Sequence, residues 1–195
     1  MNPVIETIRN RRSIRDYEEK NVPEETIRQI IDAARWAPSG ANLQPWKFIV
    51  ITNKDLMKKL SSLLKSYVIP VVKTMGNVGL MKFLPRLEDE NSNLFYNAPC
   101  LILILGKRSV LTSDWDCAMA AENMMLAADS LKLGTCWIGF AMIGLIQAIA
   151  QKDPIIDELG IPKGCKVIAP IILGYPKTKP STPPKKEPEI IKWVK

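Results

Sequence analysis

Apolar residues recur along this chain in two different periods, and the changes between them mark helices and strands. An i, i+3, i+4, i+7 spacing from Ile27 to Ala34 predicts a helix that opens at Pro23 and stops near residues 37–40. Similar patterns predict further helices over residues 2–10, 53–64 and 114–131. The last of these is apolar on nearly every side, which indicates either the core of a monomer or the centre of a homodimer.

Short apolar runs bounded by turn residues predict the strands. They cover residues 47–52, 101–105, 135–140 and 167–173, and residues 189–194 form a candidate late strand. Pro170 lies inside the fourth run, so we expect that strand at a sheet edge or at a bulge. Helices and strands follow one another without a strict βαβ rhythm. The pattern therefore predicts a single α+β domain over residues 1–195, built in three layers.

Two segments lack a regular pattern. Residues 65–96 read as irregular, and we interpret residues 61–96 as a lid or substrate segment, with a plain surface excursion as the alternative. Five prolines follow residue 175, which predicts an extended C-terminal arm over residues 176–195.

The composition excludes several classes of enzyme. The chain has no histidine, so Ser–His and Cys–His nucleophile pairs and histidine zinc sites are impossible. The four cysteines are spaced 17, 19 and 29 residues apart and form no C-x-x-C pair. Neither a P-loop motif nor G-x-G-x-x-G is present. Any enzyme built from these residues is expected to take its reactivity from a cofactor.

The net charge of +7 favours an anionic partner, which could be a nucleic acid, a membrane surface or a phosphorylated ligand. Residues 176–195 hold six lysines and two glutamates, a net charge of +4. Residues 133–151 are uncharged over the length of a membrane span, but three glycines divide them into a strand and a helix, so we expect no membrane span. The N-terminus does not resemble a signal peptide, and reduced thiols in the cytoplasm are the expectation.

Four clusters carry candidate chemistry. In an extended segment, Arg11, Ser13 and Arg15 share one face about 13 Å long, at ~3.3 Å per residue, which suits a long anionic ligand such as a mononucleotide. The other clusters are the small and amide residues 37–46, the segment 134–140 around Gly139, and Lys185 with Lys186. In the same order, the alternative interpretations of the four clusters are a solvated basic patch, a plain turn, a strand bend, and a solvated charge run or nucleic-acid arm.

Taken in order, these clusters resemble the motifs of the nitroreductase family, the FMN-dependent NAD(P)H oxidoreductases. Residues 11–15 resemble its R-R-S-x-R/K motif, and residues 38–46 resemble its P-S-x-x-N-x-Q-P-W motif, the most specific single match. Residues 97–99 resemble the D-A-P step, with asparagine in place of the acid, and residues 133–140 resemble the L-G-x-x-x-x-G-x segment. Gly174-Tyr175-Pro176 and the later lysine pair resemble the family's C-terminal ending.

The resemblance implies a role for each matching residue. Arg11 and Arg12 are expected to bind the FMN phosphate, Ser13 a ribityl or phosphate oxygen, and Arg15 the N1/O2 edge of the flavin, where a cation stabilises the reduced ring. The residues expected to cover the flavin from the other subunit are Pro38, Ser39, Gly40 and Asn42. Backbone N–H groups of Ile138 and Gly139 are expected near flavin N5, and Lys185 with Lys186 at the phosphate.

The fold implied is a mainly antiparallel central sheet wrapped by helices, in an interlocked homodimer. The activity implied is ping-pong hydride transfer from NADH or NADPH through FMN to a small-molecule acceptor, nitroaromatic or quinone. Alternatives are a reductive dehalogenase, an ene-type reductase or a flavin-fragmenting enzyme of the same fold. From other classes, a non-catalytic flavin carrier and a basic nucleic-acid-binding module remain open.

Overall fold

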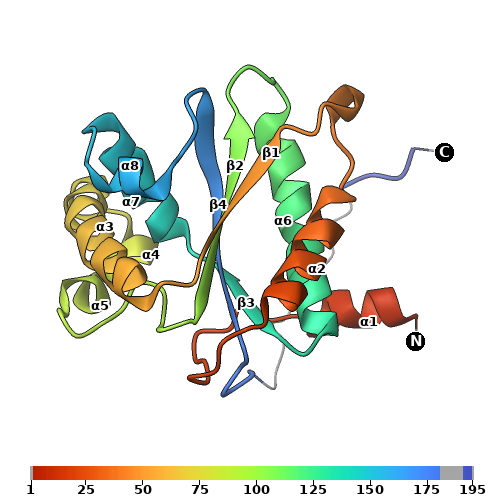
Figure 1. The fold of residues 1–195 in the computed structure, drawn as a ribbon, viewed down its shortest axis with the longest axis horizontal. Helices are drawn as coiled ribbons and strands as arrows, with labels where there is room; N and C mark the ends of the chain where they lie inside the picture. The colour runs from red at the N-terminus through yellow and green to blue at the C-terminus, as the bar shows by residue number, and fades with distance from the viewer. Residues whose placement is uncertain (1, 181–190, 195) are drawn as a thin grey trace.

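A four-stranded antiparallel sheet forms the middle layer of the protein, and helices cover both of its faces (Figure 1). The computed structural model describes residues 2–180 and 191–194. The strands are β1 (Trp46–Ile51), β2 (Cys100–Lys107), β3 (Gly134–Trp137) and β4 (Cys165–Gly174), in the order β1-β2-β4-β3. The predicted three-layer α+β architecture is confirmed.

The helices divide between the two faces. On one face lie α3 (Lys54–Met75), α4 (Val78–Met81), α5 (Leu84–Glu88), α7 (Gly139–Ala150) and α8 (Ile155–Leu159). On the other lie α1 (Pro3–Asn10), α2 (Glu24–Arg35) and α6 (Ser113–Ser130), and a short 3-10 turn, η1 (Gly40–Asn42), precedes β1. The helices predicted at residues 2–10, from Pro23 and over 114–131 are all present.

Strand β2 shows how one run of apolar residues serves two cores. Successive side chains of a strand point to opposite faces. Leu101, Leu103 and Leu105 accordingly join the core under α3 and α7, and Ile102 and Ile104 join the core under α2 and α6. Because helices cover both faces, the strand needs no polar side, as its continuous apolar sequence indicated.

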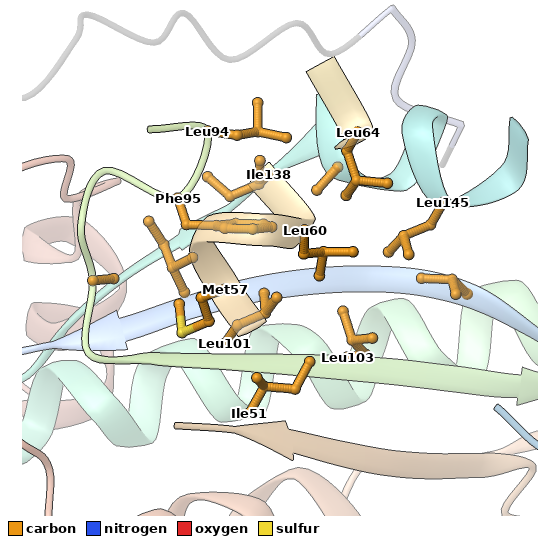
Figure 2. Packing of buried hydrophobic residues seen from close by; sticks show 14 of the residues in the cluster. Ile51, Met57, Leu60, Leu64, Leu94, Phe95, Leu101, Leu103, Ile138 and Leu145 are labelled. Atoms are coloured by element: carbon orange, nitrogen blue, oxygen red, sulfur yellow. The ribbon is translucent and has the colours of Figure 1, made fainter. Parts of the chain in front are cut away.

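Helix α3 supplies much of the first core. Figure 2 shows Met57, Leu60 and Leu64 of this helix facing Leu101 and Leu103 of the sheet, and Leu60 and Leu64 are fully buried. Asn53 caps the helix start by accepting a hydrogen bond from the Leu56 N–H at 2.9 Å.

The prediction that residues 65–96 are irregular is wrong. Helix α3 continues past Leu64 to Met75 in spite of Pro70, and α4 and α5 follow it. Pro70 and Ser66 are exposed, so the carbonyl group that loses its helical donor lies on the water side, while Val68 and Val72 hold the inner side in the core. The first part of the expected lid segment, residues 61–75, therefore belongs to a helix whose inner side is packed in the core.

Of the two positions expected for Pro170, an edge or a bulge, the edge is wrong, because β4 lies between β2 and β3. The Pro170 carbonyl accepts a hydrogen bond from the Ile138 N–H at 2.8 Å, just beyond the end of β3. In an antiparallel strand the missing N–H of Pro170 points to that same side, where the β3 ladder has ended. A register shift opposite Ile104 and Leu105 does place a bulge nearby.

Helix α6 is not buried on every side within one chain. Cys117, Ala120 and Met124 are fully buried against the sheet and α2, but Trp115 is 65% exposed and Met119 is 38% exposed. The alternative in which a single chain buries this helix on every side is thus wrong, and the homodimer alternative stays a prediction. None of the helices within the described residues is both long and apolar enough to cross a lipid bilayer.

All four cysteines are free and buried, which predicts a loss of stability at alkaline pH. Burial raises the pKa of Cys100 from 9.0 to about 12 and that of Cys117 to about 11. The folded state therefore keeps protons that the unfolded state releases, and the free energy of unfolding is expected to fall as pH rises from about 9 toward 12. Urea unfolding at several pH values measures this, and Cys100→Ala should flatten the decline. A decline of equal steepness in this variant would contradict the assignment.

Candidate functional site

The segment with Arg11 and Arg15 runs extended beside the start of β3. Ser13 forms a parallel bridge with Thr135, and the Ile14 N–H donates to the Thr135 carbonyl oxygen at 2.9 Å. Further along, Tyr17 forms an antiparallel bridge with Pro176. The predicted extended conformation is confirmed, and it places the basic side chains at the β3 edge of the sheet.

Gly134 permits this close approach. Ile14 is only 2% exposed and packs directly over Gly134, where a β-carbon would lie 2.6 Å from Ile14 Cγ1 and 2.8 Å from Ile14 Cβ. Side-chain atoms do not approach one another so closely, so any larger residue must push the basic segment away from β3.

Gly134→Ala is therefore expected to displace residues 11–15 and to weaken the binding of FMN, the ligand that the family resemblance implies, by at least tenfold, while the protein stays folded at a cost of about 1–3 kcal/mol from overpacking. Equilibrium titration of the apoprotein with FMN measures the affinity, and urea unfolding measures the stability. Gly160→Ala is the control for a generic glycine effect, since it adds its strain at the end of α8. Unchanged FMN affinity in Gly134→Ala would mean that the position of the basic segment does not matter.

The arginines of this segment differ in their surroundings. Arg11 Nε lies 3.5 Å from Glu122 Oε1, and Arg12 Nη1 donates to the carbonyl oxygens of Arg9 and Arg11 at 2.7 and 2.6 Å. Among the described residues, the buried Nε atoms of Arg11 and Arg12 have no hydrogen-bond partner. A buried donor without an acceptor is costly, and an anion bound beside it would satisfy it.

Arg15 lines a cavity of about 290 Å³ between the end of β3, the start of α7 and the α4–α5 segment. Ile138 and Gly139 line the same cavity, so three of the predicted site residues meet here. The Ile138 N–H is already bonded to Pro170. Gly139 is the first residue of α7, and its N–H has no acceptor inside the helix, so it adds to the positive end of the helix dipole.

The cavity has further lining residues, of which Cys136, Trp137 and Phe140 lie in the predicted cluster 134–140 and the rest were not predicted as site residues. Its walls are mainly apolar and aromatic, with one further arginine: Leu80, Phe83, Arg86, Leu87, Leu94, Tyr96, Cys136, Trp137, Phe140, Met142 and Ile143. Those from residues 80–96 gave no usable signal, because helices of four and five residues are too short to show a period. Burial raises the pKa of the Cys136 thiol, and Arg15 and Ser13 oppose that shift.

The loop with Pro38, Ser39, Gly40 and Asn42 lies elsewhere. The Gly40 N–H donates to Asp116 Oδ1 at 3.1 Å, and a β-carbon at Gly40 would lie 2.6 Å from Thr112 Oγ1, so the loop is held on the start of α6. This is the end of the sheet where β1 begins, at the top of Figure 1, whereas β3 lies at the bottom. One chain does not bring this loop to the cavity. Lys185 and Lys186 lie outside the described residues.

The fold and cavity define a class: an α+β protein that can hold a flat ligand on an apolar floor with a cationic edge. The sequence comparisons agree with that class. A model of the Nitroreductase family matches residues 8–175, and the chain belongs to this family.

Individual relatives span nearly the whole chain. A candidate NADH dehydrogenase/NAD(P)H nitroreductase of Methanothermobacter thermautotrophicus is 32% identical over 97% of this chain and 87% of its own length. An FMN reductase [NAD(P)H] of Bacillus subtilis is 29% identical over 98% of this chain and 73% of its own. The crystal structure of a nitroreductase with bound FMN from Desulfitobacterium hafniense superposes with a TM-score of 0.80, at 27% identity and full coverage of both chains.

Proposed function

We propose that this protein is an FMN-dependent oxidoreductase that passes hydride from NADH or NADPH to a small oxidised acceptor, nitroaromatic or quinone. The observation that carries the proposal is the meeting of Arg15 with the start of α7 in one apolar cavity, in a chain of the nitroreductase family. The FMN-dependent activity follows from the relatives, and the type of acceptor is our extension of it.

The residues present fit the phosphate end of FMN. The buried Nε atoms of Arg11 and Arg12 have no hydrogen-bond partner among the described residues and suit a phosphate, although Arg11 Nε also lies 3.5 Å from Glu122 Oε1, and Ser13 is an exposed hydroxyl beside them. We assign Arg11, Arg12 and Ser13 to the phosphate and ribityl chain. Each arginine already has one contact within the chain: Arg12 Nη1 with the end of α1, and Arg11 Nε with Glu122. Lys185 and Lys186 are proposed to close the same site.

The ring end fits the cavity. FMN, when bound, supplies the hydride chemistry by alternately accepting and releasing two electrons. Arg15 and the Gly139 N–H place positive charge at the edge of the cavity, where they stabilise negative charge on a reduced ring. Both groups are exposed in the single chain, so these interactions are weaker than in a site closed to water. Donor and acceptor take turns in one cavity, so no protein nucleophile is needed.

We propose further that the protein is a homodimer whose partner supplies Pro38, Ser39, Gly40 and Asn42. The loop cannot reach the cavity of its own chain, so a site that uses both needs two copies. The chain also exposes large apolar side chains: Trp115 at the start of α6, the helix that holds the loop, and Val4, Ile5 and Ile8 of α1, which lies at the lower right of Figure 1. Exposed apolar patches of this kind are typical of protein interfaces.

Complementation between two inactive variants tests the shared site. Arg15→Met and Asn42→Ala are each expected to impair both sites of a homodimer. Co-refolding them in equal amounts should restore about a quarter of the wild-type turnover, because half of the dimers are mixed and each mixed dimer has one intact site. Mixing without refolding is the control. No recovery in mixed dimers would place both residues in the site of a single chain.

An absorption spectrum of the purified protein, followed by anaerobic addition of NADH or NADPH, tests the function itself. A flavin spectrum that bleaches supports the oxidoreductase, and the faster donor gives the nicotinamide preference. A flavin spectrum that stays coloured supports a carrier instead. A colourless protein that takes up no FMN would overturn the proposal. The four free thiols fit a reducing compartment, and we propose the cytoplasm.

A further inference from the structure

The residues assigned to the cofactor form only part of the lining of the cavity. Its outer part is formed by α4, α5 and the start of α7, with Leu80, Phe83, Leu87 and Phe140 as apolar lining. The rings of Phe83 and Phe140 meet edge to face, with centroids 5.5 Å apart at 68°. Walls of this kind suit a flat, conjugated molecule.

The charge of the lining is one-sided. Arg15 and Arg86 are the charged residues that line the cavity in the described part of the chain, and both are positive. Arg15 is assigned to the cofactor, which leaves Arg86 without a role. A cation beside an apolar cavity, with no carboxylate in its lining, favours an acidic group on the ligand.

The Arg86 side chain is held in place by Tyr96 and Asn93. Its guanidinium lies 4.2 Å from the centroid of the Tyr96 ring, and its Nη2 donates to the Asn93 carbonyl oxygen at 2.9 Å. Stacking leaves the edge of the guanidinium open for a planar acid. No carboxylate within residues 2–180 and 191–194 pairs with it.

The backbone around Arg86 is anchored by buried polar groups of α3. Lys65 is 7% exposed, and its Nζ donates to the Asp89 and Ser92 carbonyl oxygens at 2.6 and 2.9 Å. Ser61 Oγ accepts from the Leu94 N–H at 2.8 Å. Ser92 in turn donates its hydroxyl to the Arg86 carbonyl oxygen. The segment that carries Arg86 is thus fixed to the core, which preorganises the side chain for binding.

We propose that Arg86 binds an acidic group of the electron acceptor, so that the preferred acceptors are planar aromatic carboxylates. The inference rests on the proposed function, which supplies the electrons. With 4-nitrobenzoate as the probe, the nitro group takes up two electrons and two protons. One of its oxygen atoms leaves as water, and a nitroso group remains on the ring. The carboxylate meanwhile forms a bidentate pair with Arg86.

The test compares 4-nitrobenzoate with its methyl ester, which has the same ring without the charge. The FMN-loaded protein is reduced with dithionite, so that the nicotinamide donor plays no part, and reoxidation by each acceptor is followed. Arg86→Met is expected to lower the second-order rate constant for the acid about tenfold and that for the ester less than twofold. Dividing variant by wild type for each acceptor cancels their different intrinsic reactivities. Arg86→Lys should recover part of the loss.

Lys82→Met is the matched control, because Lys82 is an exposed cation on the same segment and does not line the cavity. It should change neither rate. Equal losses for acid and ester in Arg86→Met would show that Arg86 only shapes the wall, and no loss would show that it does not meet the acceptor. Either result overturns the proposal while leaving the bleaching by NADH intact.

Binding supplies a readout that does not depend on electron transfer. Trp137 lines the cavity, so quenching of tryptophan fluorescence by 4-nitrobenzoate reports its binding even in protein without FMN. The dissociation constant should rise about tenfold in Arg86→Met and stay unchanged for the ester. Equal constants in wild type and variant would contradict the proposal, even if the proposed oxidoreductase activity had already failed.

Discussion

Arg15→Met is expected to slow the reduction of bound flavin by NADH about 100-fold while the protein keeps its FMN. Arg15 lies at the edge of the cavity beside Ile138 and Gly139, and a guanidinium there stabilises the negative charge that a reduced ring acquires. Removing one such preorganised group lowers rates by about 100- to 1000-fold. We take the lower end because Arg15 is exposed in the single chain.

Stopped-flow bleaching of the flavin absorbance measures this rate, and a separate FMN titration measures retention. Arg15→Lys keeps the charge and should recover much of the rate. Arg28→Met is the matched control, since Arg28 pairs with Glu24 on the outer surface of α2. An unchanged reduction rate in Arg15→Met would remove Arg15 from the ring edge, and loss of FMN would assign it to cofactor binding instead.

Leu60→Ala is expected to lower the free energy of unfolding by about 2–5 kcal/mol. Leu60 is fully buried between α3 and the sheet, where Figure 2 shows it among Leu64, Leu101 and Leu103. The smaller side chain leaves a cavity that two packed layers cannot close. Because native domains are stable by only about 5–15 kcal/mol, this loss is a large part of the total.

Urea unfolding at one fixed protein concentration measures the change. Leu111→Ala is the matched control: the same atoms are removed from a side chain that is 92% exposed, and the effect should stay within about 0.5 kcal/mol. A loss of less than 1 kcal/mol in Leu60→Ala would mean that α3 is not packed on the sheet as described.

The strands and most helices could be predicted because the pattern of apolar residues in each of them extends over enough positions to be recognised. Ile102 and its neighbours form an unbroken apolar run, and α2 repeats its apolar positions from Ile27 to Ala34, over two turns. The predicted end of helix α3 is too early, because proline normally breaks a helix. Only the fold shows that Pro70 faces water. The position of β4 between β2 and β3 could not be predicted, because it depends on which strands pair in the folded protein.

The residues of the candidate site also divide into those that the sequence predicts and those that it does not. The motif around Arg11 and Arg15 could be found from the sequence, and the structure brings Arg15 to Gly139. Arg86 and Tyr96 could not, because they reach the cavity through two short helices and a left-handed turn at Tyr96, where φ is 54°. The Gly40 loop joins the cavity only in the proposed homodimer, because within one chain it is held on the start of α6.

The anchoring of residues 76–96 bears on how this protein can change in evolution. Apart from Leu87, Leu94 and Phe95 in the core and the polar anchors Ser61 and Lys65, the segment makes its hydrogen bonds largely within itself. Its exposed side chains and its lining residues other than Leu87 and Leu94 are therefore free to vary together. Acceptor preference can drift through this one module, while the sheet, the basic segment and their stability are inherited unchanged.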